Sequence, residues 1–388
     1  MVSAAIKIGL DASCLIPQPL TGVGYYTLHQ LRALLSEDRG LEFRLFASSA
    51  QAAPEYLREL GRRCEHMRTL RCPTRLKNLA WTQFEWPPIE RFVGPVDVAH
   101  GCFHLLPAAR RAKRMATVFD LSGIRCPHTH SAGDVGLHRR LLRHAVAKAD
   151  ALVAISESSK ADLVELLGAA PERVYVVYGG VLLEEFDRDL DGEALAALKA
   201  RFGITGEYVI HLGTLEPRKN LARLIEAYGR VRARRGECPA LVLAGKAGWM
   251  YDDVFETIER LGLGDSVIHT GYLERAEAVC LLRGACGCVY PSLYEGFGLP
   301  VLEAMAARVP VLTSKVSSLP EVVGDTGLLV DPESVDAIEA GLFELIEERA
   351  AGSERATRAY ERAQNFTWQR SAAALADVYR AVYAGGAS

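Results

Sequence analysis

Short apolar runs alternate with longer amphipathic stretches along most of the chain. In the first half, the runs typical of buried strands are Ile6–Leu10, Phe43–Phe46, Val96–Ala99, Met115–Phe119, Ala151–Ile155 and Val174–Val177. Amphipathic stretches, such as 24–36 and 137–147, lie between several of them. A strand, helix, strand order repeated in this way predicts a parallel sheet with helices on both faces.

The same alternation starts again in the second half, after an acidic, strand-poor linker at about 180–205 with a predicted helix at 193–202. The predicted strands there are Tyr208–Leu212, Ala240–Ala244, Val267–His269, Cys288–Tyr290 and Val309–Thr313. We therefore expect an α/β fold with two similar domains, 1–180 and 205–365. Ligands of open α/β sheets bind beyond the carboxyl ends of the strands, so we expect the chemistry in a cleft between the domains.

Composition indicates an ordinary folded chain. Of the 388 residues, 49% are hydrophobic and 24% are charged, which excludes a disordered or collagen-like protein. No uncharged apolar run reaches the roughly 18 residues of a membrane-spanning helix, and no signal-peptide pattern precedes the first strand. The nine cysteines follow no disulfide framework, which is typical of a reduced, cytoplasmic protein.

The charge differs between the halves. Residues 1–180 carry 23 Lys and Arg against 17 Asp and Glu, whereas residues 181–388 carry 22 against 31. A basic half favours an anionic partner. The clusters Arg110–Arg114 and Arg139–Arg143 predict peripheral contact with an anionic membrane face, or alternatively a solvated helix surface. Nucleic-acid binding is disfavoured, because no basic stripe crosses both halves and no recognition motif occurs.

Three segments that follow predicted strands combine glycines with charge. Thr21-Gly-Val-Gly24 opens the first helix, where backbone amides and the helix dipole favour a phosphate, although the third glycine of a dinucleotide fingerprint is absent. Gly213–Asn220 places Arg218 and Lys219 in a turn between a strand and a helix. Adjacent cations there suit a diphosphate, the alternative being solvated surface charge.

The third segment, Tyr290–Met305, carries the most specific pattern. A strand ends near Pro291, a glycine-containing loop follows, and a helix begins at about Leu299 with Pro300 near its first position. Glu295 then lies in the loop and Glu303 about one turn inside the helix. The amides at the start of this helix are available to phosphate oxygens.

The string Glu295-Gly-Phe-Gly-Leu-Pro-Val-Leu-Glu303 resembles the Glu-x7-Glu motif of family four of the retaining glycosyltransferases. The resemblance covers nearly the whole chain. It extends over the motifs Thr21–Gly24, Ile155–Lys160, Gly213–Asn220, Leu243–Gly245, Thr270–Tyr272 and Phe366–Trp368. It implies the GT-B fold, two Rossmann-like domains that face each other across a cleft, with a helical segment at 366–388 crossing back to the first domain.

The resemblance implies a role for each matching residue. Arg218 and Lys219 would hold the donor diphosphate, Glu295 the sugar hydroxyls and Glu303 the ribose. Donor contacts are implied at Gly22, Gly24, Gly213, Arg218, Lys219, Gly245, Gly271, Tyr272, Glu295, Gly296, Phe297, Gly298, Leu299 and Glu303. The expected catalytic residues are Asp120, Arg218, Lys219 and Glu295. We expect no metal and no cofactor besides the UDP- or GDP-linked sugar, because the cations and helix amides stabilise the leaving group.

The chain departs from the family at Phe119-Asp120, where many members have His-Asp. Phenylalanine cannot donate a hydrogen bond, so Asp120, His100 and His104 are the candidates for contact with the sugar or acceptor. Each histidine is equally well explained as a packed residue. The segment Trp81–Trp86 is a candidate acceptor groove or simply part of the packing. A metal site is disfavoured for the set His128, His130, His138 and His144, whose spacing matches no zinc motif.

The sequence thus predicts a retaining hexosyltransferase that transfers a mannose- or glucose-type sugar to a saccharide or lipid-linked saccharide. A sugar-nucleotide epimerase of the same architecture and a catalytically silent nucleotide-sugar-binding subunit remain as alternatives. The silent subunit is kept open by Phe119 and opposed by the complete set of donor-site residues.

Overall fold

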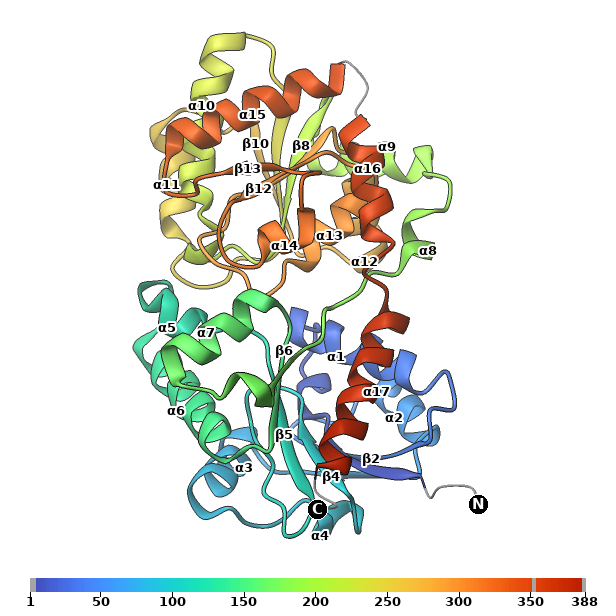
Figure 1. Cartoon of the computed structure of the whole chain (residues 1–388). Coiled ribbons are helices and arrows are strands. Elements are labelled where there is room, and N and C mark those ends of the chain that lie inside the picture. The colour runs from blue at the N-terminus through green and yellow to red at the C-terminus, as the bar shows by residue number, and fades with distance from the viewer. Residues whose placement is uncertain (1–4, 351–353, 386–388) are drawn as a thin grey trace. The chain divides into compact units, whose positions relative to one another are not determined.

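The computed structural model describes residues 5–350 and 354–385 and divides the chain into two compact α/β units. Unit 1 comprises residues 1–124, 132–180 and 368–388, and unit 2 comprises residues 125–131 and 181–367. Helices lie on both faces of each sheet (Figure 1). Residues 386–388 of the predicted final segment lie outside the described part of the chain.

Unit 1 is built on a parallel sheet of seven strands. Along the sheet the order is β3-β2-β1-β4-β5-β6-β7. The strands are β1 (Ile6–Asp11), β2 (Leu41–Ser48), β3 (His66–Leu70), β4 (Val98–Gly101), β5 (Lys113–Val118), β6 (Ala151–Ala154) and β7 (Val174–Val176). Its helices are α1 (Gly22–Leu34), α2 (Glu55–Arg62), α3 (Thr74–Leu79), α4 (Glu90–Val93), α6 (Ala132–Lys148), α7 (Glu157–Leu167) and α17 (Trp368–Ala384). The short α5 (Ser122–Arg125) ends at the division between the units.

Unit 2 repeats the plan with six parallel strands in the order β10-β9-β8-β11-β12-β13. These are β8 (Tyr208–Leu212), β9 (Ala240–Ala244), β10 (Val267–Gly271), β11 (Gly287–Tyr290), β12 (Val311–Ser314) and β13 (Leu328–Val330). The helices are α8 (Leu183–Phe186), α9 (Gly192–Phe202), α10 (Leu221–Arg235), α11 (Asp252–Arg260), α12 (Arg275–Arg283), α13 (Leu299–Ala306), α14 (Leu319–Val323), α15 (Val335–Ala350) and α16 (Glu354–Ala363). The segment expected as a linker forms α8 and α9 and belongs to unit 2.

The hydrophobic pattern places the strands correctly because both faces of each sheet are buried. All residues of β8 and β11 are buried, and their apolar runs are continuous. The two strands that the pattern misses are β3 and β13, which lie at sheet edges. Most of β3 is exposed and β13 has only three residues, so neither has the long apolar run of a central strand.

The strand order changes direction at one place in each sheet. In unit 1 the chain order reverses between β1 and β4, and in unit 2 between β8 and β11. In doubly wound sheets the loops that follow such a pair of strands diverge and leave a crevice for a ligand. In unit 2 those loops are 213–220 and 291–298, the two segments that the sequence analysis selects.

The last helix, α17, packs in unit 1. Gln30 Nε2 of α1 donates a hydrogen bond to Ser371 Oγ of α17 at 2.9 Å. Trp368 is buried, and its ring meets that of Tyr26 edge to face at a centroid distance of 5.4 Å. Helix α17 is therefore part of the core of the first unit.

Candidate active site

The turn after β8 carries the two cations. Its backbone is joined to the loop after β11 by the hydrogen bond from Leu293 N to Arg218 O (2.9 Å). Asn220, at the start of α10, donates from its side-chain amide to Pro291 O (3.0 Å) and Pro332 O (2.6 Å). These buried bonds hold the turn against the β11 loop, and so fix where Arg218 and Lys219 point.

Both cations converge on Glu295. Lys219 Nζ lies 2.7 Å from Glu295 Oε1, and Arg218 Nη1 lies 2.7 Å from Glu295 Oε2. The second terminal nitrogen of this guanidinium, Arg218 Nη2, donates to Glu216 Oε1 at 2.6 Å. Lys219 Nζ also donates to the hydroxyl of Tyr290 at 2.6 Å. Two carboxylates thus balance two cations in a nearly buried network.

Burial and charge act against each other in this network. Burial by itself raises the pKa of Glu295, but Arg218 and Lys219 outweigh it and lower that pKa to about 2. Burial and the neighbouring Arg218 lower the pKa of Lys219, while Glu295 and Glu216 raise it. Glu295 is therefore a carboxylate at neutral pH and cannot act as a proton donor there.

The loop that holds Glu295 is fixed by two serines. Glu295 N donates to Ser317 Oγ (2.9 Å), and Ser318 Oγ donates to the carbonyl oxygens of Glu295 and Phe297, each at 2.9 Å. The loop ends at Gly298, whose φ of 106° lies in a region that L side chains rarely adopt. Helix α13 begins directly after this loop, with Leu299.

Glycines also line the ends of the neighbouring strands. Gly245 N donates to Gly271 O at 3.0 Å, and Gly213 N donates to Ala244 O at 2.9 Å. A Cβ added to Gly245 would lie 1.9 Å from Gly213 O, so only glycine permits this close approach of the two backbone segments. The structure therefore brings Gly213, Gly245 and Gly271 together, with Tyr272, about half exposed, directly after them.

Glu303 lies on α13, away from the Arg218–Lys219 pair. Its Oε1 accepts a hydrogen bond from Arg275 Nη1 at 2.7 Å, and the same guanidinium is bound by Glu185 of α8 at 2.6 Å. Burial raises the pKa of Glu303, and Arg275 opposes this. Sequence reasoning missed Arg275 and Glu185, since nothing in their local pattern distinguishes them from surface charges.

Two further side chains lie beneath the glycine turn and were also missed. His211 and Tyr290 stack with ring centroids 4.9 Å apart, at the ends of the two central strands of unit 2. His211 is fully buried, and its Nδ1 lies 3.1 Å from Val289 O. Its Nε2 has no hydrogen-bond partner among the residues that the structure describes. Burial, with the charge of Lys219, lowers the pKa of His211 to about 4, so the ring is neutral at pH 7.

The candidate residues of unit 1 have different surroundings. His100 is buried, with Nδ1 2.8 Å from the Tyr379 hydroxyl and Nε2 2.9 Å from Thr117 Oγ1. Both ring nitrogens have partners inside the unit, which favours the packing interpretation, and a sugar contact by His100 stays a prediction. Burial lowers its pKa to about 3.

The other two candidates of unit 1 stay predictions. His104 is buried beside His138, and its Nδ1 has no hydrogen-bond partner in the described part of the chain. Asp120 is partly exposed, and its Oδ1 accepts hydrogen bonds from Ser122 N (3.0 Å) and Ser122 Oγ (2.7 Å) at the start of α5. A helix-capping role therefore accounts for one of its oxygens.

The glycine loop of unit 1 forms the start of α1. The helix begins at Gly22, two residues before the predicted start, and Thr21 Oγ1 caps it by accepting from Gly24 N at 3.4 Å. A Cβ on Gly24 would lie 2.6 Å from a side-chain carbon of Leu20, whereas a Cβ on Gly22 would meet nothing within 4 Å. Packing thus explains Gly24, and Gly22 borders open space.

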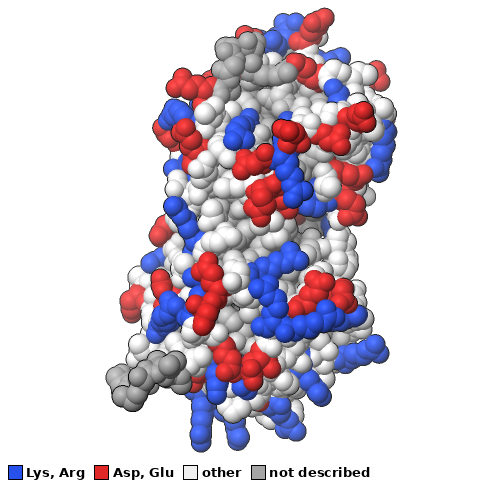
Figure 2. All heavy atoms as spheres, turned by 90° about the vertical axis from the view of Figure 1, so that its right-hand side faces the viewer, with Lys and Arg blue, Asp and Glu red and all other residues white. Residues whose placement is uncertain are grey.

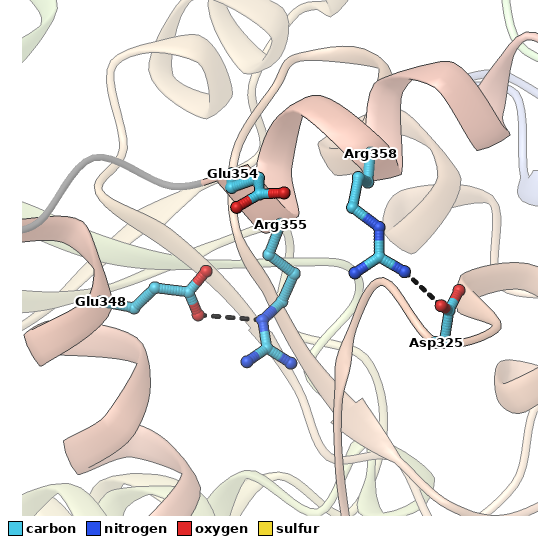
Figure 3. A pocket seen from close by; sticks show the side chains of 5 residues that line it. All are labelled: Asp325, Glu348, Glu354, Arg355 and Arg358. Atoms are coloured by element: carbon cyan, nitrogen blue, oxygen red, sulfur yellow. Dashed lines mark hydrogen bonds and ion pairs between the residues drawn. The ribbon is translucent and has the colours of Figure 1, made fainter.

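A separate charged pocket in unit 2 does not qualify as a donor site. It is lined by Asp325, Glu348, Glu354, Arg355 and Arg358 (Figure 3). Its arginines are already bound by carboxylates: Arg355 Nε lies 3.0 Å from Glu348 Oε2, and Arg358 pairs with Asp325. In the described part of the chain, no group of three or more His, Cys, Asp or Glu side chains is placed to hold a metal ion.

Known proteins resemble both units. The family model "Glycosyltransferase Family 4" matches residues 20–185, and "Glycosyl transferases group 1" matches residues 198–366. O-antigen chain mannosyltransferase B of Escherichia coli is 29% identical over 373 residues, which cover 94% of this chain and 97% of that protein. Glycogen synthase of Mycobacterium tuberculosis is 30% identical over 330 residues, covering 81% of this chain and 74% of that protein.

A solved structure agrees in fold. HepE from Anabaena, crystallised with UDP and glucose, has a TM-score of 0.72 at 20% identity and covers 97% of this chain and 100% of that one. It supports the GT-B fold. Together with the cation pair, the Glu295–Glu303 spacing and the two family models, these likenesses show that the chain belongs to family four of the GT-B glycosyltransferases and is a hexosyltransferase.

Proposed function

We propose that the chain is a retaining mannosyltransferase, with a glucosyl donor as the second choice, that uses a GDP- or UDP-linked sugar without a metal ion. The observation that carries the proposal is the convergence of Arg218 and Lys219 on Glu295 at the point where the strand order of unit 2 reverses. Mannose is preferred because E. coli relatives are named as mannosyltransferases. A saccharide or lipid-linked saccharide is the proposed acceptor.

The charge balance of the network suggests how the donor enters. Glu295 pairs with both cations, so a diphosphate would compete with that carboxylate for them. On binding, Arg218 and Lys219 turn to the phosphate oxygens, and Glu295 becomes available to the sugar hydroxyls. Glu216 remains with Arg218 and keeps its guanidinium oriented. The amides of Gly298 and Leu299 then add hydrogen bonds to the phosphate.

The proposed reaction needs no protein nucleophile. The bond between the anomeric carbon and the phosphate oxygen breaks, and the acceptor hydroxyl forms the new bond on the same face of the sugar. Its proton passes to the departing phosphate oxygen. Lys219 and Arg218 lower the barrier by stabilising the negative charge that develops on the nucleoside diphosphate.

Arg275 has a proposed role in nucleotide binding. It holds Oε1 of Glu303, and so turns the other carboxylate oxygen toward the ribose hydroxyls while keeping the carboxylate charged. Glu185 fixes the guanidinium from α8. Arg275 is thus a positioning residue in this proposal.

Calorimetry tests the donor site directly. GDP, UDP and ADP, with the matching sugar nucleotides, are titrated into the protein in the presence of a chelator. We expect one base to bind and Arg218→Ala to abolish the heat, whereas Arg234→Ala, an exposed arginine of α10 outside the network, leaves it unchanged. Binding that requires added metal would reject the metal-free donor site.

Two alternatives have specific tests. A silent subunit, which Phe119 in place of histidine favours, would bind the nucleotide sugar but transfer nothing to any acceptor. An epimerase would change the donor sugar without an acceptor, which product analysis detects.

We also propose that the protein works in the cytoplasm, at the inner face of the membrane, where a lipid-linked acceptor is accessible. Within the described residues, no helix combines the length and apolarity needed to cross a bilayer.

A further inference from the structure

A strip of large apolar side chains is exposed on unit 1. It consists of Leu76 and Leu79 on α3, Phe84 at the end of the π-helical turn Ala80–Phe84, and Trp86 just beyond it. Their side chains are 57%, 46%, 73% and 58% exposed, in that order. Among the described residues of unit 1, every exposed large hydrophobic side chain except Tyr383 lies between residues 70 and 86.

The helix geometry favours one face for Leu76, Leu79 and Phe84. Leu76 and Leu79 are three residues apart, the spacing of one side of an α-helix. Five residues separate Leu79 from Phe84, which in an α-helix would place them on different sides. The π-helical turn has a hydrogen bond from Glu85 N to Ala80 O, and residues five positions apart in a π-helix lie nearly above one another, which favours the same side for Leu79 and Phe84.

The opposite face of the same helix is buried. Lys77, four residues before Trp81, reaches Asp11 Oδ2 at 2.5 Å, and Trp81 is 1% exposed in a hydrophobic cluster. The inner face thus anchors the helix to the sheet, and the outward apolar strip adds nothing to that packing. The aromatic segment Trp81–Trp86 is therefore divided: Trp81 packs, while Phe84 and Trp86 face solvent.

Cations surround the strip. Arg71 and Arg75 are exposed next to it, and the Arg91 guanidinium lies 5.7 Å from the centre of the Trp86 ring. The acidic residue within the strip, Glu85, lies within 3.7 Å of Arg114, His144 and Lys148. The surroundings of the apolar strip are therefore positive, which favours an anionic partner.

Helix α6 lacks this combination. Its cluster Arg139–Arg143 has exposed arginines, but no large apolar side chain of α6 is exposed. A basic helix without apolar groups gains only screened electrostatic attraction to a membrane, whereas apolar side chains with basic neighbours also gain from burial among the lipid chains. Figure 1 shows the positions of α3 and α6 in unit 1.

We propose that the strip Leu76–Leu79–Phe84–Trp86 is the surface by which the enzyme docks on an anionic lipid bilayer. A bilayer suits it better than a protein partner because the strip is the convex face of a helix with arginines on its border. Trp86 and the arginines can lie at the headgroup level while Phe84 and the leucines enter the acyl boundary. The inference rests on the proposed function only in its choice of a membrane-borne acceptor.

Vesicle sedimentation tests the surface without any donor chemistry. The full chain is mixed with vesicles of phosphatidylcholine alone or with added phosphatidylglycerol. We expect binding to the anionic vesicles, and a loss of at least about tenfold in the partition coefficient for Leu76→Glu combined with Phe84→Glu. Phe255→Glu, at an exposed apolar side chain of unit 2, is the matched control and leaves binding unchanged.

Trp86 provides a second readout. The Trp249→Phe variant removes the exposed tryptophan of unit 2. Trp86 is then the exposed tryptophan that remains, because Trp81 and Trp368 are buried. Brominated anionic lipids would then quench the exposed Trp86 if it enters the bilayer. Absence of quenching in a vesicle-bound protein would overturn the proposal.

Other outcomes also decide. If Arg139→Glu with Arg140→Glu abolishes vesicle binding while the Leu76 and Phe84 changes do not, α6 is the surface and the proposal is wrong. If the wild type ignores vesicles but forms a dimer that the Leu76 and Phe84 changes dissociate, the strip is a protein interface instead. Sugar transfer to a soluble saccharide is measured in parallel. If the wild-type protein binds vesicles but transfers no sugar, the proposed function is contradicted and the docking surface is not.

Discussion

Each α/β unit places a buried lysine–carboxylate pair at the carboxyl end of its central strands. In unit 1, Lys77 pairs with Asp11 at 2.5 Å, and in unit 2, Lys219 pairs with Glu295 at 2.7 Å. Both pairs are at least nine-tenths buried. Only the second is joined by another cation, Arg218, and by glycine turns.

The difference lies in what surrounds each pair. Asp11 Oδ1 also accepts a hydrogen bond from the hydroxyl of Ser13. The same hydroxyl accepts a hydrogen bond from Lys77 Nζ at 2.8 Å, so Asp11, Ser13 and Lys77 bond to one another. In unit 2 the Lys219 side chain and His211 Nε2 both lie within 3.7 Å of the position that a Cβ on Gly213 would take, and this nitrogen has no hydrogen-bond partner among the described residues. The unit 1 pair thus has the surroundings of a structural ion pair, whereas the second cation and the glycine turns are the reason for proposing a diphosphate site in unit 2.

Lys77→Ala should have the largest effect, and on stability alone. It leaves Asp11 buried without its cation, which typically costs about 3–5 kcal/mol. We expect urea unfolding to show this loss, and the folded protein to bind nucleotide as the wild type does. Lys77→Met with Asp11→Leu should recover much of the stability. If folded Lys77→Ala bound nucleotide more weakly than the wild type, the Lys77–Asp11 pair would not be purely structural, and the proposed difference from the Lys219–Glu295 pair would be wrong.

Lys219→Ala should reduce turnover and leave stability nearly unchanged. Arg218 still neutralises Glu295, so the fold persists, whereas a charge that stabilises the leaving diphosphate is lost. We expect turnover to fall by about 10²–10³-fold. Steady-state kinetics with the nucleotide sugar measures it, and Arg234→Ala serves as the control. Wild-type turnover in Lys219→Ala would remove the electrostatic role proposed for this pair.

Arg275→Gln should weaken nucleotide binding by about tenfold, the expected loss when one charged hydrogen bond to Glu303 is removed. Because burial raises the pKa of Glu303 and Arg275 opposes this, the variant should also lose affinity at a higher pH as the solution is acidified. Arg275→Lys should restore part of the affinity. Calorimetry over a range of pH measures both effects, and tighter binding in Arg275→Gln would show that the guanidinium blocks the ribose.

The smallest effect concerns pH and the packed histidine of unit 1. The pKa of His100 falls from 6.5 to about 3 because it is buried. The unfolded chain therefore binds its proton first, so the stability that His100 contributes is complete above pH 6.5 and decreases as the pH falls toward 3. His100→Gln should reduce the dependence of unfolding free energy on pH between 7 and 5. An unchanged pH dependence would mean that His100 is accessible to protons in the fold.

Charge distribution over the surface adds a further contrast. Figure 2 shows acidic and basic side chains mixed over much of the visible face, with several Lys and Arg side chains projecting together at one end of unit 1. This agrees with the sequence count of residues 1–180.

The sequence by itself determined the features that depend on neighbours along the chain. Strand and helix periodicity placed most elements within a few residues, because buried strands and amphipathic helices repeat over short windows. The eight-residue spacing of Glu295 and Glu303 around Gly298 and Pro300 located one carboxylate in a loop and the other in α13. Glycines at strand ends marked the turns in the same local way.

Only the tertiary structure decided the partners of the charged and polar groups. Lys77 and Asp11 are 66 residues apart, and Arg275 reaches Glu303 from another helix. The burial of His100 depends on Tyr379, at the far end of the chain, and the exposure of Phe84 depends on a π-helical turn. Such pairings follow from which elements pack together, and a local pattern cannot specify this because the same residue types serve equally well on a solvated surface.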